Sequence, residues 1–233
     1  MSRLRLASVA AAALAAVVLA ASPAPASAGC GPAGYAYAGM QSLRDGFGIS
    51  TTLTALATPS VESGHVAGWV GVGAPGEGPG GTDEWLQVGL NSLRDTGHTL
   101  YYEIARPGHR DTEYVEVARN VPVGRALRVA VLETAAKRGT WRVWVDGKAV
   151  SPPIALPDSH GRLTPMAMAE SWDGGRPACN RYAYDFEDVA IATAPGGPWQ
   201  TVRRATVLQD PGYRLQRRSL ASFVAASAAR PAA

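Results

Sequence analysis

The stretch Trp85-Leu86-Gln87-Val88-Gly89-Leu90 shows most clearly how this chain folds. Successive side chains of a β-strand point to opposite faces, so a strand with one buried face alternates between apolar and other residues. Here the two leucines and the valine occupy one face, which suits a hydrophobic core. The other face carries Trp85 and Gln87 beside a glycine. This pattern predicts a half-buried strand with an aromatic and an amide side chain on its open face.

The same strand-like character recurs along the chain, with Gly, Pro, Asn and Asp between the segments. Eight further strands are predicted at 51–56, 65–72, 99–105, 112–117, 126–133, 140–145, 163–172 and 182–192. Asp146-Gly147 predicts a tight hairpin, because a type I′ turn needs positive φ at both central residues. Short strands with frequent turn signals and no long helical pattern predict an all-β sandwich or barrel.

The two ends of the chain read differently from this middle part. Residues 1–28 are predicted to be a signal peptide, with a basic start, an apolar run and Ala26-Ser27-Ala28 as the cleavage site. Residues 29–233 are then one secreted domain, with no second apolar stretch long enough to enter a membrane stably. Within it, 29–50 form an N-terminal segment, with a removable pro-segment as the alternative, and the Ala-rich tail 225–233 is expected to fray.

Cysteine and arginine usage fits an exported protein. Cys30 and Cys179 are the two cysteines, and we expect them to form a disulfide, with a lipid on Cys30 as the alternative. The formal net charge is +3, and arginine pairs at 203–204 and 217–218 make the C-terminal part basic. These arginines alternate with apolar residues, so they predict a solvated strand face and no nucleic-acid partner.

Two further predicted strands repeat the pattern of the Gln87 strand. In 166–172, Glu170 shares a face with two methionines and Trp172. In 99–105, Tyr101 and Glu103 share a face. A concave sheet with these side chains would form a groove for an extended polymer, and its carboxylate and amide would activate a water and hold an oxyanion. The non-catalytic alternatives are that Gln87 is simply solvated, that Glu170 is paired with an arginine, and that Trp69 lies in the core.

In their order and spacing, these segments resemble the eqolisin-type glutamic peptidase family, acid endopeptidases with a lectin-like β-sandwich. The resemblance rests on Trp69-Val70-Gly71, Gln87-Val88-Gly89, Tyr101-Tyr102-Glu103 and then Glu170, and covers about 67–192. It implies a concanavalin-like or jelly-roll β-sandwich of two antiparallel sheets. The chain departs from the family at Val88, at Tyr101, at Ser171 after the acid, and in a longer 74–82 stretch.

The resemblance also implies roles for individual residues. Glu170 would act as general base and then as proton donor to the leaving amine, while Gln87 would stabilise the oxyanion. The subsites for an extended polypeptide would be lined by Trp69, Trp85, Tyr101, Glu103 and Trp172. We therefore favour an enzyme, a secreted acid-acting endopeptidase, working as a monomer without a cofactor or a metal.

The main alternative is a non-catalytic carbohydrate- or wall-binding sandwich, since tryptophan and tyrosine also stack on the sugar rings of a polysaccharide. A glycosidase would need two acids on one strand face, and Asp185 with Glu187 is the nearest approach. The four histidines show no metal-ligand spacing, and no Gly-x-Ser-x-Gly elbow is present. The glycine-rich stretch 74–82 lacks the end of a phosphate-binding loop, so we expect a flexible loop at the groove's edge.

Overall fold

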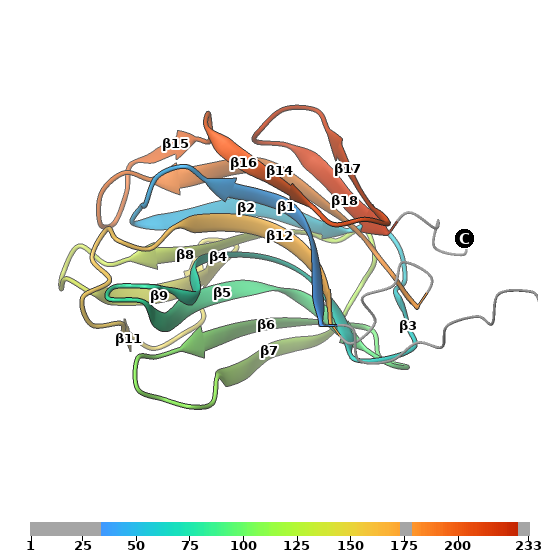
Figure 1. Ribbon diagram of the computed structural model, residues 1–233, viewed down its shortest axis with the longest axis horizontal. Helices are drawn as coiled ribbons and strands as arrows, with labels where there is room; N and C mark the ends of the chain where they lie inside the picture. Colours follow the sequence, from blue (N-terminus) through green and yellow to red (C-terminus); the bar gives the residue numbers. More distant parts are fainter. Residues whose placement is uncertain (1–33, 173–178, 228–233) are drawn as a thin grey trace, which may run out of the picture.

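The computed structural model describes residues 34–172 and 179–227, and in these residues it contains β-strands and no helix (Figure 1). The strands form two large antiparallel sheets, so the predicted all-β sandwich is confirmed. The signal peptide predicted at 1–28, Cys30 and residues 228–233 lie outside the described residues. The predicted disulfide therefore stays a prediction. In the described part, no helix is long and apolar enough to cross a membrane.

The first sheet, called the groove sheet below, has seven strands, and Figure 1 shows the run from β1 down to β7 stacked in order. In spatial order they are β16 (Ala205–Gln209), β1 (Tyr35–Ser42), β12 (Pro165–Trp172), β4 (His65–Gly78), β5 (Thr82–Leu93), β6 (His98–Ala105) and β7 (Glu113–Val121).

The second sheet, called the back sheet, has nine strands. Its main path is β10 (Lys148–Ala149), β9 (Thr140–Val145), β8 (Ala126–Glu133), β2 (Gly48–Ala55), β14 (Ala183–Ala192), β18 (Phe223–Ser227) and β17 (Tyr213–Arg217). Beside it, β11 (Ile154–Ala155) pairs with β9 and β15 (Trp199–Thr201) pairs with β14, while β3 (Ser60–Val61) and β13 (Asn180–Arg181) form a separate pair.

One hydrophobic core lies between the two sheets, and the alternation of β5 supplies part of it. Leu86, Val88 and Leu90 are fully buried in the same cluster as Leu53 and Phe186 of the back sheet. Burying a side chain of this size stabilises the fold by roughly 1.5–3 kcal/mol. The even-numbered face of β5 is therefore fixed towards the core, which leaves Trp85 and Gln87 on the outer face of the groove sheet.

The Asp146-Gly147 hairpin is confirmed. Both residues have positive φ, 48° and 75°, between strands β9 and β10. The expectation of a flexible loop at 74–82 is wrong, because β4 continues to Gly78 and β5 begins at Thr82. A shift in register between Ala74 and Gly78 absorbs the extra residues. Glycine tolerates the positive φ that such irregular pairing needs, and Gly76 has a φ of 72°.

Both chain ends of the domain are more ordered than the sequence suggests. Strand β1 lies inside the groove sheet between β16 and β12, so the alternative of a removable pro-segment does not fit residues 35–42. The predicted fraying is wrong for 225–227, because they belong to β18 and Ala225 is fully buried. Alanine and serine lack large apolar side chains, but their small size lets β18 pack closely in the sheet.

Candidate functional site

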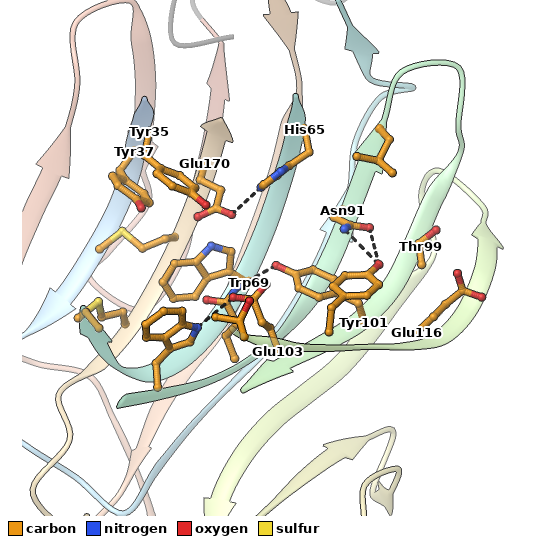
Figure 2. Close-up of a pocket in the computed structure, with 18 of the residues that line it drawn as sticks. Tyr35, Tyr37, His65, Trp69, Asn91, Thr99, Tyr101, Glu103, Glu116 and Glu170 are labelled. Carbon is orange, nitrogen blue, oxygen red and sulfur yellow. Dashed lines mark hydrogen bonds and ion pairs between the residues drawn. The ribbon is translucent and has the colours of Figure 1, made fainter. Parts of the chain in front are cut away.

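A groove of about 1290 Å³ runs over the outer face of the groove sheet (Figure 2). Its floor is a second, smaller apolar cluster that is separate from the core between the sheets. The members of this cluster come from β4, β6 and β12: Ala67, Trp69, Tyr101, Met166 and Met168. The predicted shared face of these strands is therefore present, and it is hollow enough to accept an extended ligand.

Strand register sets where the two predicted catalytic side chains lie. Gln87 pairs with Gly71 across β5 and β4, and Glu170 pairs with Ala67 across β12 and β4. Trp69 lies between these two levels of β4. The small residues of β4 leave room above the strand, and a Cβ on Gly71 would lie 2.8 Å from the Cβ of Gln87. Both side chains line the same groove.

Gln87 is held by a tyrosine. Its side-chain Nε2 donates a hydrogen bond of 3.1 Å to Tyr101 Oη, and Gln87 is only 8% exposed. The ring of Tyr101 stacks on Tyr114 with 5.2 Å between the ring centroids. A primary amide has two N–H groups, so one hydrogen bond to Tyr101 leaves the second N–H free to donate.

Glu170 is nearly buried in the groove beside a histidine. It is 5% exposed, and its Oε1 lies 3.2 Å from Nε2 of His65 (Figure 2). Burial raises the pKa of Tyr101, and the charges of Glu170 and then Glu103 raise it further. Tyr101 thus accepts the hydrogen bond from Gln87, and the charge of Glu170 acts on its phenol from a different level of the groove.

A second acid lies beside Gln87. Glu103 pairs directly with Gln87 across β5 and β6, and Trp85 Nε1 donates a hydrogen bond of 3.1 Å to Glu103 Oε1. Burial raises the pKa of the Glu103 carboxyl, the bond from Trp85 lowers it, and the charge of Glu170 raises it. A carboxyl in this setting holds its proton to higher pH than a solvated one.

The remaining predicted groove residues fall into two groups. Trp69, on the floor, and Trp85 line the groove, as do Tyr101 and Glu103. Trp172 is 37% exposed and stands beside the groove, with its ring 5.6 Å from that of His65. On the β1 side, Tyr35 and Tyr37 stack with ring centroids 5.7 Å apart and form a second aromatic wall.

Several groove residues escaped the sequence reasoning, above all His65, Tyr37 and Asn91. His65 is on the same face of β4 as Ala67 and Trp69, so period-two alternation was the available signal. That signal does not say which strand lies next to β4. The pairing of His65 with Trp172 joins residues more than a hundred positions apart in the chain, and only the folded sheet reveals it.

The acids of the glycosidase alternative lie elsewhere. Asp185 and Glu187 are in β14 of the back sheet, and both accept from Arg218, at 2.5 and 3.4 Å. The arginines at 203, 204, 214, 217 and 218 of the basic C-terminal part are exposed, as expected, but those at 203, 204 and 218 lie outside the strands, so the predicted strand face holds only for 214 and 217. Within the described ranges, no group of three or more His, Cys, Asp or Glu side chains is arranged to hold a metal.

Comparison with known proteins shows that solved structures share this fold. The chain is similar to the structure of scytalido-glutamic peptidase with a peptide-based transition state analog, at a TM-score of 0.58 and 16% identity, over 82% of this chain and 98% of that chain. It is also similar to SCP-B, a member of the eqolisin family of peptidases in complex with the tripeptide Ala-Ile-His, at 0.54 and 17%, over 82% and 97%. No family model and no curated protein matches the sequence.

Proposed function

We propose that this protein is an acid-acting endopeptidase in which Glu170 and Gln87 form the catalytic pair. The observation that carries the proposal is their common setting. Two nearly buried polar side chains from distant parts of the sequence line one groove, and Tyr101 lies within the influence of both. The fold shared with glutamic peptidases supports the same reading.

The residues then divide the reaction between them. Ionised Glu170 takes a proton from a water molecule, and the water oxygen bonds to the carbonyl carbon of the scissile peptide. Gln87 donates its free N–H to the oxyanion that develops. A donor of this type contributes about 3 kcal/mol to transition-state stabilisation. As the C–N bond breaks, Glu170 returns the proton to the leaving amine, so the carboxylate is regenerated.

The substrate of the proposed enzyme is an extended polypeptide. Exposed strand-like chains fit a long groove over a sheet, and the two tyrosine pairs provide apolar walls for side chains. Trp69, Trp85, Tyr101 and Glu103 would contact the chain near the reacting bond, with Trp172 at one end. We further propose that the enzyme is secreted after removal of 1–28, with Cys30 and Cys179 paired, and that it acts as a monomer.

The test is proteolysis of a denatured protein at acidic pH by the chain without residues 1–28. Glu170→Gln and Gln87→Ala are each expected to lower kcat/KM by about a hundredfold or more, because each removes one role in the transition state. Glu187→Gln, a matched change on the back sheet, should leave the rate unchanged. Unchanged cleavage by Glu170→Gln would contradict the mechanism, and retention of polysaccharide without proteolysis would favour the binding alternative.

A further inference from the structure

The carboxylate of Glu170 has a basic partner that its own strand does not supply. His65 begins β4, directly opposite Trp172 of β12 and on the groove side. Its Nε2 lies 3.2 Å from Oε1 of Glu170, while the side chain of His65 is 22% exposed and that of Glu170 is 6% exposed. The pair is therefore shielded on one side and open to the groove on the other.

Aromatic rings hold the imidazole in this position. The ring of His65 lies 5.6 Å from that of Trp172, at 33° between the planes, and 6.2 Å from that of Tyr35 in an edge arrangement. Tyr35 and Trp172 also contact each other, at 6.2 Å. A ring packed by two neighbours loses rotamer freedom, so its Nε2 stays directed at Glu170.

The charges around the pair are mostly negative. From β6, Glu103 is close enough that the charges of both Glu170 and His65 act on its pKa, Glu170 raising it and His65 lowering it. From β1, Tyr37 faces Glu170, and Asp210 accepts from the Tyr37 backbone N–H at 2.7 Å. Tyr101 completes the set from β6. Burial raises the pKa of both tyrosines, so they stay neutral in acid and at neutral pH.

Few basic groups offset these acids. Among the described residues that line the groove, the basic side chains are His65 and Arg119. Arg119 is in an ion pair with Glu116 of its own strand, with 2.6 Å between Nε and Oε1. His65 is thus the basic side chain that faces Glu170. When protonated, an imidazole is a cation.

We propose that His65 is a positioning residue for Glu170, whose protonated ring keeps the carboxylate ionised and oriented in acid. The inference rests on the proposed function. A general base is useful only while it is ionised, and an adjacent cation favours the ionised form. His65 thereby extends activity to a lower pH than an isolated buried carboxylate would allow.

The experiment is the dependence of kcat/KM on pH for cleavage of an unfolded protein, with variants at position 65. His65→Gln keeps a hydrogen-bonding side chain but removes the charge. We expect the acidic limb of its profile to move to higher pH by about one unit, since an opposite charge at this distance shifts a carboxyl group by one to three units. His65→Lys restores a cation and should move the limb back towards the wild-type position.

A matched control separates charge from general damage. His109 is exposed in the turn between β6 and β7, so His109→Gln should leave the profile unchanged. Thermal unfolding of each variant verifies the fold. An unchanged acidic limb in a folded His65→Gln variant would overturn the inference. An active Glu170→Gln variant would instead overturn the proposed function, so the two failures are distinguishable.

Discussion

At the scale of single residues, the buried carboxyl of Glu84 makes the stability of the fold depend on pH. Glu84 precedes Trp85 but points to the opposite, core-facing side, where it is fully buried. Neither carboxylate oxygen has a hydrogen-bond partner among the described residues. Burial, and then the charge of Asp158, raise the pKa of Glu84 from 4.5 to about 7. The folded protein therefore holds this group in its neutral form in acid.

The consequence for stability has a definite sign. A group whose pKa is raised in the folded state stabilises the fold fully below its unfolded value, about 4.5, and this stabilisation is lost as the pH rises through about 7. The loss is on the order of 3 kcal/mol, at 1.36 kcal/mol per pKa unit. Glu84→Gln should remove most of this dependence, as measured by urea unfolding at pH 4.5 and pH 8.

Equal pH dependence in the Glu84→Gln variant and the wild type would contradict this account of Glu84. Asp111→Asn, a change at an exposed carboxyl in the loop between β6 and β7, serves as the control. The glutamine variant is also expected to keep the fold at acidic pH, since an amide is neutral like the protonated acid it replaces.

The sequence identified part of the candidate site at this scale, and for a physical reason. Alternation places Gln87, Tyr101, Glu103 and Glu170 on the open faces of their strands, and all four line the groove. It could not reveal His65 as the partner of Glu170, because that contact depends on the neighbouring strand. Nor could alternation show that Trp172 stands beside the groove, because the open face of the sheet is larger than the groove on it.

At the scale of elements, strand β1 completes the floor and one wall of the groove. It pairs with β12 along seven positions, from Tyr35 with Trp172 to Gln41 with Met166, and with β16 on its other side. The sequence alone does not mark it as a strand, because its core-facing side carries the small residues Ala36 and Ala38, so its alternation gives little apolar signal. In the sheet small residues are useful, since a Cβ on Gly39 would clash with Ala167 and Met168.

Removing β1 is expected to unfold or grossly destabilise the protein. A chain that begins at residue 43 leaves β12 and β16 without the strand between them. It also lacks the buried side chains of Ala38 and Met40, so the core residues that pack against them become exposed to water. A chain that begins at residue 29 should fold. Far-ultraviolet circular dichroism and thermal unfolding compare the two, with Cys179→Ser in the longer chain as the control for loss of the predicted disulfide.

A cooperative, folded protein from the shorter chain would show that β1 is dispensable and would restore the pro-segment alternative.

The glycine-rich hairpin of β4 and β5 is a second element that the sequence pattern predicts incorrectly. Gly and Pro at 75–81 suggest a loop, yet β4 runs on to Gly78 and pairs there with Thr82 of β5, so only 79–81 form the turn, because a ladder needs no side chains.

At the scale of the whole molecule, the two sheets have separate tasks. The groove sheet buries one face in the common core and offers the other to a ligand, while the back sheet covers the core. Alternation predicted that each sheet has a buried and an open face, and it predicted nine of the eighteen strands in the described residues. It could not predict the order β16-β1-β12-β4-β5-β6-β7, because hydrogen bonding between distant strands leaves no local trace in the sequence.

This order places Glu170 and Gln87 on the two strands that flank β4, four residues apart in register along it, with Trp69 between the two levels. The central claim is that they act as one unit in peptide hydrolysis. Residues that act as a unit have non-additive effects, because the first substitution already removes what the second would remove.

The most direct measurement is a double-mutant cycle on kcat/KM at acidic pH, with Gln87→Ala, Glu170→Gln and the two combined. We predict that the double variant is no more than about tenfold slower than the slower single variant, instead of showing the product of both losses. Full activity in either single variant, or two losses that simply multiply, would contradict a joint role for this pair.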